Sequence, residues 1–190
     1  MNSLNNKALS KYCERAIANS ASISAERKEL LNQLVGYIEN TGRDGKTPQL
    51  NFICTHNSRR SHLAQIWAFT AAYYYKVSVN TFSGGTEATA FNSSAVSAIK
   101  SAGFMVDALG SVNPKYTISI NSSTHYTVWS KTFDDSFNPK ENFAAVMTCS
   151  EADENCPVIP GATERIPLRY EDPKQFDGTS EEKVRYEERS

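Results

Sequence analysis

The sequence has no apolar run that approaches the roughly 20 residues a membrane-spanning helix needs. Its 20 lysines and arginines nearly balance its 21 aspartates and glutamates, and it has neither a basic tract nor an acidic tail, so nothing supports nucleic-acid binding. The first residues lack the apolar core of a signal peptide. We therefore expect a soluble, cytoplasmic protein with no nucleic-acid partner and no membrane partner.

Cysteine is scarce, with four in a chain of 190 residues. Disulfide frameworks are rare in the cytoplasm, so cysteines there favour metal or redox chemistry. A metal site is the weaker interpretation, because the two closest cysteines are separated by six residues rather than two and no histidine pair accompanies them. We predict neither a metal nor a cofactor. The length of the chain is enough for one domain with a real core.

The most informative stretch runs from Leu50 to Gln65. An apolar run predicts a buried strand at 48–53, and apolar residues at helical spacing predict a helix over 59–75. Between them lies a turn of small and polar residues that begins at Cys54 and reaches Arg60. The first amides of a helix are unpaired and its dipole is positive there, so a strand, a tight loop and a helix together are suited to hold an oxyanion.

The same stretch supplies a nucleophile. The loop amides and the guanidinium of Arg60 would stabilise the thiolate of Cys54, and Arg60 is a planar, bidentate donor. A cysteine that ends a buried strand is often an ordinary core residue, but the polar loop, Ser61 directly after Arg60 and the amphipathic helix favour a functional motif. The predicted oxyanion-binding residues are Thr55, His56, Asn57, Ser58, Arg59, Arg60 and Ser61.

Cys54 and the seven residues after it show the pattern Cys, five residues, Arg, Ser. This segment resembles the phosphate-binding loop of the low-molecular-weight protein tyrosine phosphatase superfamily, which includes the thioredoxin-coupled arsenate reductases. Two positions depart from the commoner pattern: His56 stands where the family usually has glycine, and Arg59 where it often has a second cysteine. Glycine would allow a positive φ, which histidine tolerates less well. The likeness covers roughly residues 48–110 and 143–186.

Further strands are predicted at 77–83, 143–148 and 163–168, and a helix at 92–102. Alternating strands and helices imply a parallel sheet covered on both faces, with the site at the carboxyl ends of the strands. The resemblance implies an α/β fold, a three-layer sandwich around a small four-stranded parallel sheet. Residues 83–86, Ser-Gly-Gly-Thr, resemble the family's turn after the second strand.

Two regions lie outside this pattern. Apolar periodicity predicts helices over 4–20 and 24–42, whose apolar faces suggest a helical hairpin. We assign residues 1–47 to an N-terminal helical extension and 48–190 to the main domain. Residues 111–142 are rich in β-formers around a polar turn and predict an inserted β-hairpin. Contact with a substrate or partner and simple surface elaboration are both open as the role of this hairpin.

A second cysteine pair supports redox chemistry. Cys149 follows a buried strand, as Cys54 does, so both are expected at one edge of the sheet. Cys156 follows after about two helical turns if the segment between is helical, which places the two sulfurs too far apart for a bond. A disulfide between them would require this segment to loosen. The run 146–157 is similar to the redox segment of the thioredoxin-coupled arsenate reductases, whereas plain tyrosine phosphatases typically lack the pair.

An acid is predicted in the loop after the last strand. Asp172 precedes Pro173, and its carboxyl group would protonate a departing oxygen. An Asp-Pro pair also simply starts turns, but the resemblance implies the acid role. A final helix is predicted from Ser180, with that serine as its cap. The predicted catalytic residues are Cys54, Arg60, Asp172, Cys149 and Cys156.

The resemblance leaves three functions to compare. The first is arsenate reduction, in which Cys54 attacks arsenate and oxidation passes to a Cys149–Cys156 disulfide that thioredoxin reduces. The second is hydrolysis of phosphotyrosine or aryl phosphates through a phosphorylated Cys54, since arsenate and phosphate share charge and shape. The third is a redox-sensing or arsenic-binding module without turnover. We predict arsenate reduction, with an oxyanion and thioredoxin as partners, because of the cysteine pair.

Overall fold

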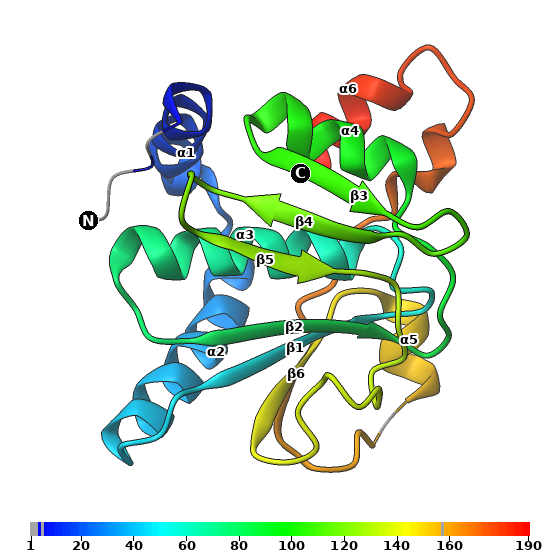
Figure 1. Cartoon of the computed structure of the whole chain (residues 1–190). Coiled ribbons are helices and arrows are strands. Elements are labelled where there is room, and N and C mark those ends of the chain that lie inside the picture. Colours follow the sequence, from blue (N-terminus) through cyan, green and yellow to red (C-terminus); the bar gives the residue numbers. More distant parts are fainter. Residues whose placement is uncertain (1–3, 5, 157) are drawn as a thin grey trace.

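The computed structural model describes residue 4, residues 6–156 and residues 158–190. The first residues of the predicted extension (1–3 and 5) and Pro157 of the predicted redox segment lie outside the described residues. The predicted α/β class is confirmed, because strands and helices alternate along the chain (Figure 1). None of the helices in the described part is both long enough and apolar enough to cross a membrane.

The central sheet has four parallel strands, as predicted. They are β1 (Gln49–Cys54), β2 (Asn80–Gly85), β6 (Phe143–Met147) and β7 (Ala162–Ile166), in the order β2-β1-β6-β7. The two central strands, β1 and β6, are almost entirely buried, which explains why both read as apolar runs in the sequence. Because all four strands run the same way, their carboxyl ends meet at one edge of the sheet.

Helices flank this sheet. They are α1 (Lys7–Asn19), α2 (Ala25–Arg43), α3 (Arg60–Tyr75), α4 (Ser93–Ala102), α5 (Ser150–Asn155) and α6 (Glu182–Arg189), with 3-10 turns η1 (Ser20–Ser22) and η2 (Pro173–Phe176). Asn6 caps α1 and Asn92 caps α4, each by accepting two backbone N–H bonds. The predicted cap of the last helix is wrong: Glu181 rather than Ser180 precedes α6, and no side chain bonds to its first amides.

Both faces of the sheet are covered. Leu50 and Phe52 of β1 pack with α2 and α3 on one face. Ile53 of β1 and Met147 of β6 pack with α5 and Phe133 on the other. This alternation follows from the two-residue period of a strand. Cys54, at the end of β1, belongs to the same buried cluster as Ala152 of α5, so the nucleophile loop starts next to α5.

The predicted hairpin exists, but as part of a larger unit. β4 (Lys115–Ser119) pairs antiparallel with β5 (His125–Val128) and also with β3 (Met105–Leu109), giving a second sheet of order β3-β4-β5. β3 was not predicted, because its apolar residues on both sides of Asp107 do not alternate with polar ones, and four of its five residues are exposed. Ile118 and Val128 pack this sheet into the core that α3 and α4 also form (Figure 1).

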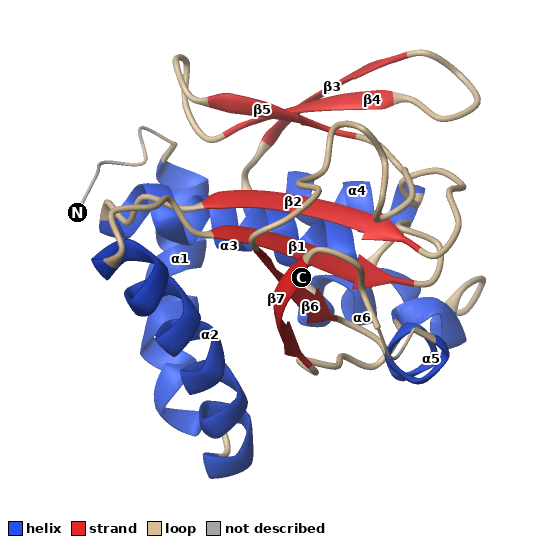
Figure 2. Ribbon diagram, turned by 90° about the horizontal axis from the view of Figure 1, so that it is seen from below, coloured by secondary structure: helices blue, strands red, loops and turns tan. Residues whose placement is uncertain are grey.

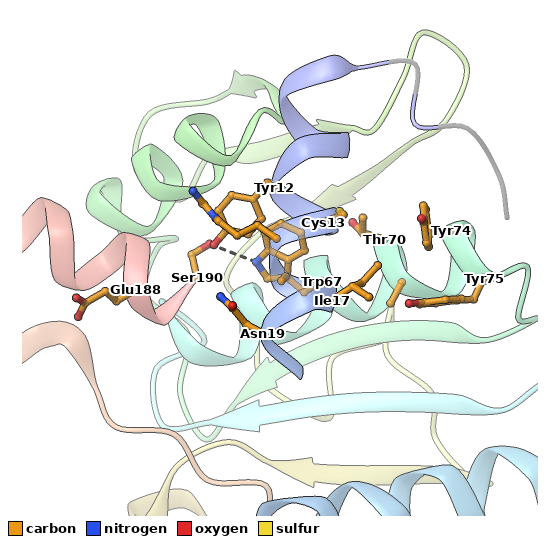
Figure 3. Close-up of a pocket in the computed structure, with 13 residues that line it drawn as sticks. Tyr12, Cys13, Ile17, Asn19, Trp67, Thr70, Tyr74, Tyr75, Glu188 and Ser190 are labelled. Atoms are coloured by element: carbon orange, nitrogen blue, oxygen red, sulfur yellow. Dashed lines mark hydrogen bonds between the residues drawn. The ribbon is translucent and has the colours of Figure 1, made fainter. Parts of the chain in front are cut away.

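The two N-terminal helices do not form the predicted hairpin. Leu9 of α1 packs into the cluster that holds α3 and α4, whereas Tyr37 of α2 packs into the cluster on the central sheet. Tyr12 of α1 stacks on Trp67 of α3 with ring centroids 5.0 Å apart (Figure 3). Each helix thus buries its apolar face against the main domain and not against the other helix. The boundary at residue 47 stays a prediction.

Replacing Leu9 by alanine should lower the free energy of unfolding by about 2–5 kcal/mol, because Leu9 is fully buried and the change leaves a cavity. Chemical denaturation measures this value. Ile17→Ala on the same helix is the matched control: Ile17 is 40% exposed, and its loss should cost less than about 1 kcal/mol. If Leu9→Ala lowered the free energy of unfolding as little as Ile17→Ala, α1 would not contribute to the core.

Candidate active site

The predicted oxyanion loop lies at the carboxyl edge of the central sheet. Cys54 is the last residue of β1 and Arg60 the first of α3, and the residues between them form the turn. Figure 2 shows the arrowheads of β1 and β2 pointing toward the end of the sheet where α5 lies. The backbone N–H groups of His56, Asn57 and Ser58 donate to no acceptor among the described residues, which leaves them available to an anion.

Side chains of the loop fix its shape from within. Asn57 donates from Nδ2 to Ser61 Oγ at 2.8 Å, and its Oδ1 accepts from the backbone N–H of Lys131 at 2.9 Å. Ser61 Oγ lies 3.0 Å from Cys54 Sγ and is the polar contact of the thiol. Ser58 donates to a carbonyl of the loop after β2 at 2.7 Å. The hydroxyls and the amide therefore hold the backbone in place for an oxyanion.

The left-handed position of the loop is Asn57, with φ of 44°, and not position 56. Asparagine is among the non-glycine residues that adopt this conformation most readily. The side chain of His56 is partly exposed, and its Nε2 lies 3.2 Å from Glu87 Oε1. The carbonyl of His56 accepts from Ser130 Oγ at 3.0 Å and from Thr89 Oγ1 at 3.1 Å. Histidine in place of glycine is thus compatible with the loop.

The glycine pair that ends β2 lets this strand end and the oxyanion loop pack against each other. A β-carbon on Gly85 would overlap the carbonyl oxygen of Glu87 and lie only 2.6 Å from the carbonyl oxygen of Thr55. A β-carbon on Gly84 would overlap the backbone of Phe133. Such close backbone approach is open only to glycine. The resemblance of this turn to the family pattern therefore has a packing reason.

Gly85→Ala should destabilise the fold by about 1–3 kcal/mol through overpacking. It should also weaken binding of inorganic phosphate by about 10-fold to 100-fold, because a displacement of about 1 Å in a binding loop is enough for such a loss. Thermal unfolding and calorimetric titration measure the two effects. Gly42→Ala, whose β-carbon would meet nothing within 4 Å, is the control and should bind phosphate normally. Equal binding by both variants would contradict the packing argument.

The structure brings Arg60 and Asp172 together beside the loop. Asp172 Oδ2 lies 2.6 Å from Arg60 Nη2, and Arg60 Nη1 donates to the carbonyl of Tyr170 at 3.3 Å. Arg60 Nε is buried and has no hydrogen-bond partner within the described part of the chain. The guanidinium therefore keeps an unused donor, and an entering oxyanion would compete with Asp172 for Nη2 and with the Tyr170 carbonyl for Nη1.

Cys54 and Cys149 share one buried cluster. Cys54 is 3% exposed and Cys149 is fully buried. The hydroxyl of Thr55 lies 3.5 Å from Cys149 Sγ and donates to the Glu151 carboxylate at 3.0 Å. Thr55 thus connects the oxyanion loop to the start of α5. The expectation that both cysteines lie at one sheet edge agrees with this geometry.

Cys149 and Cys156 stand at opposite ends of α5. Cys149 is the residue before the helix, and its sulfur accepts an N–H bond at 3.4 Å from the first turn. Cys156 directly follows the helix and is half-buried; all four cysteines of the chain are free thiols. The carboxylate of Asp153, which is buried, is paired with both Arg165 and Arg169. These ion pairs fasten α5 to the chain around β7.

The guanidinium of Arg59 points away from the loop, which the sequence did not indicate. Its Nη2 lies 2.8 Å from Asp177 Oδ2, and its Nε donates to Tyr186 Oη at 2.6 Å. Only the backbone N–H of Arg59 is therefore left for an oxyanion. Neither Asp177 nor Tyr186 was predicted to belong to the site, because both lie more than a hundred positions away in the sequence and carry no local motif.

Two buried bases accompany the loop. Burial lowers the pKa of His62 well below its ordinary value, and Nδ1 lies 3.2 Å from Ser83 Oγ. Burial also lowers the pKa of Lys131 to about 8, and its Nζ lies 4.6 Å from the ring centroid of Trp129. Within the described ranges, no three or more histidine, cysteine, aspartate or glutamate side chains are grouped to hold a metal.

No protein-family model matches the chain. It is 31% identical over 132 residues to the arsenate reductase of Halalkalibacterium halodurans, covering 70% of this chain and 78% of that protein. It is 29% identical over 144 residues to arsenate reductase 2 of Staphylococcus saprophyticus, covering 76% and 91%. A solved thioredoxin-dependent arsenate reductase of Corynebacterium glutamicum aligns with 95% of this chain and 90% of its own at 18% identity, with a TM-score of 0.42. On the identity and extent of the first match, the chain belongs to the arsenate reductase family.

Proposed function

We propose that this protein reduces arsenate to arsenite, with Cys54 as the nucleophile and with Cys149 and Cys156 as the thiols that take up the oxidation. One observation carries the proposal: a thiol in an amide-lined loop shares a buried cluster with a second thiol, and a third stands at the far end of a short helix. The names of the relatives support the same activity.

The first step is attack on arsenate. The loop N–H groups and Arg60 hold the oxyanion, and the Cys54 thiolate attacks arsenic. A sulfur–arsenic bond forms while one arsenic–oxygen bond breaks. Asp172, released from Arg60 as the oxyanion binds, takes up a proton from solvent and passes it to the departing oxygen, which leaves as water. The 2.6 Å contact between Arg60 and Asp172 supports this assignment, because it puts the acid beside the residue that holds the substrate.

The second step moves two electrons to arsenic. The Cys149 thiolate attacks Cys54 Sγ, so a disulfide bond forms and the sulfur–arsenic bond breaks with its electron pair left on arsenic, which departs as arsenite. Cys156 then attacks Cys149 Sγ, forming the Cys149–Cys156 disulfide and freeing the Cys54 thiolate. Two thiols have lost one electron each, and arsenic has gained two.

The last exchange requires α5 to unwind. Seven residue steps of helix separate the two cysteines by about 10 Å, whereas a disulfide needs Cα atoms within about 7 Å. The ion pairs of Asp153 with Arg165 and Arg169 oppose this opening in the reduced protein. A single six-residue helix is short enough to open locally while the rest of the fold stays intact.

We further propose that a dithiol protein of the thioredoxin type reduces the Cys149–Cys156 disulfide. A dithiol suits this bond, because the mixed disulfide formed by its first sulfur is resolved by its second. Cys156 is the more exposed member of the pair, which supports it as the sulfur attacked. Turnover driven by thioredoxin with its reductase, and not by glutathione with glutaredoxin, would bear out this choice.

A single-turnover experiment tests the proposed function. Fully reduced protein is mixed with arsenate, free thiols are alkylated, and peptides are mapped by mass spectrometry. We expect one disulfide per chain, located at Cys149 and Cys156, and one equivalent of arsenite. Inorganic phosphate in place of arsenate is the matched control and should leave all thiols free. Free thiols with arsenate, together with hydrolysis of an aryl phosphate, would instead assign phosphatase chemistry to the loop.

A further inference from the structure

Two neighbouring arginines each hold one end of the same short turn. Asp172 and Asp177 flank η2 as the residues immediately before and after it. Arg60 pairs with Asp172 at 2.6 Å, and Arg59 pairs with Asp177 at 2.8 Å. Residues 172–178, here called the η2 segment, are therefore tied to the start of α3 at both ends.

The tie at Arg59 is a closed triangle. Tyr186 Oη accepts from Arg59 Nε at 2.6 Å and donates to Asp177 Oδ1 at 2.6 Å, while Arg59 Nη2 contacts the other oxygen of the same carboxylate. Tyr186 is 1% exposed, and burial raises its pKa to about 12, so its hydroxyl stays a donor at neutral pH. Charge-assisted bonds that support one another in this way are stronger than isolated surface pairs.

The two ties differ in what happens when substrate binds. On the proposed function, an oxyanion in the loop competes with Asp172 for Arg60 Nη2, so the contact between Arg60 and Asp172 is lost when the oxyanion binds there. The guanidinium of Arg59 is directed to Asp177 and Tyr186 and, among the described residues, makes no hydrogen bond or ion pair with the interior of the loop, so its tie persists. Without it, binding of substrate would remove both ties between the η2 segment and the start of α3, and the segment would be held by other contacts, such as the bond from the Gly178 N–H to Glu182.

We propose that Arg59, Asp177 and Tyr186 anchor the η2 segment while arsenate occupies Arg60, and that this anchor keeps Asp172 within reach of the departing oxygen. Arg59 is then a positioning residue that acts through Asp172 and not an oxyanion ligand through its side chain. The role of Asp172 rests on the proposed function, whereas the anchoring itself does not. The two parts are therefore tested separately.

Hydrogen exchange tests the anchoring without turnover. The N–H groups of Lys174 and Asp177 are hydrogen-bonded within the η2 segment, so their exchange reports its order. We expect saturating inorganic phosphate to leave exchange in the wild type nearly unchanged, but to speed it about 10-fold or more in Arg59→Met. Arg43→Met, which removes an exposed arginine on α2, is the matched control. Identical exchange in Arg59→Met and Arg43→Met would overturn the anchor.

A double-mutant cycle tests the link to Asp172. Arg59→Met should lower kcat for arsenate about 10-fold to 100-fold, the scale of a misplaced general acid, with KM changed less than about 3-fold. In the Asp172→Asn background the same change should cost nothing further, because the acid is already lost. Tyr186→Phe, which keeps the buried ring, should give a smaller fall in kcat. An undiminished loss in the Asp172→Asn background, or a rise in KM without a fall in kcat, would overturn the positioning role.

Discussion

Substitution of serine for Cys54 should abolish arsenate reduction, with kcat/KM falling on the order of 10⁴-fold or more, as when an essential nucleophile is removed. Serine is close in size to cysteine and can keep the contact that Cys54 makes with Ser61, so the loop should retain its shape and bind oxyanions. A serine hydroxyl is not ionised near neutral pH, and it offers no sulfur for Cys149 to attack. Arsenite production in a coupled assay measures the loss.

Cys13→Ser is the matched control for this prediction. Cys13 is half-buried on α1 and lines a cavity of about 440 Å³ against α3, in a different core cluster from Cys54 (Figure 3). The control should retain activity within about 2-fold, since substitutions away from the working groups rarely have larger effects. Arsenate-dependent oxidation of Cys149 and Cys156 that survives in Cys54→Ser would show that another thiol makes the first attack.

Replacing Arg60 by lysine should lower kcat/KM for arsenate by about 10²-fold to 10³-fold, the range for losing a donor to a developing anion. Lysine keeps the positive charge, but a single ammonium group cannot span two oxygens as a guanidinium does. It also cannot reproduce the contacts of Arg60 with Asp172 and with the carbonyl of Tyr170. Steady-state kinetics with arsenate measure the change.

Arg43→Lys is the matched control, because it shows whether replacing any arginine by lysine lowers activity or only the replacement of Arg60 in the loop. Arg43 is exposed near the end of α2, and its partners among the described residues are side chains of its own helix. Arg43→Lys should therefore leave kcat/KM unchanged within about 2-fold. A loss of less than about 3-fold in Arg60→Lys would show that the guanidinium does not bind the oxyanion in two places.

The sequence was informative wherever burial leaves a continuous apolar trace. β1 and β6 are central parallel strands, and their position follows from apolar runs alone. β2 begins at Asn80, three residues later than predicted, because Lys76 ends α3 in a left-handed conformation and Val77 is exposed. The pairing of β3 could not be predicted, because most of its residues are exposed. The separate packing of α1 and α2 could not be predicted either, because an amphipathic face shows that a helix is packed but does not identify the surface it packs against.

In the candidate site, too, some features could be predicted from the local sequence and others could not. The loop from Cys54 to Ser61 could be read as a local motif, and the contacts of Ser61 with Cys54 and Asn57 join residues that are near in the sequence. The side chain of Arg59 could not be placed, since its partners Asp177 and Tyr186 come from the far end of the chain. The bridge that Thr55 makes to Glu151 also required the tertiary structure. Local motifs thus indicate the chemistry, and distant partners determine where each side chain points.

Cys149 and Cys156 stand at the two ends of α5. If they form the proposed disulfide, the reduced and the oxidised protein differ in the surface around this helix. On the proposed function, Cys149 and Cys156 cannot be bonded while α5 is intact, so a molecule that carries this disulfide would display an opened segment that the reduced structure does not display. A reductant that recognises the opened segment would select spent molecules and ignore those awaiting substrate. The substrate would then bind the reduced protein and the reductant would bind the oxidised protein, so the two would not compete for the same form.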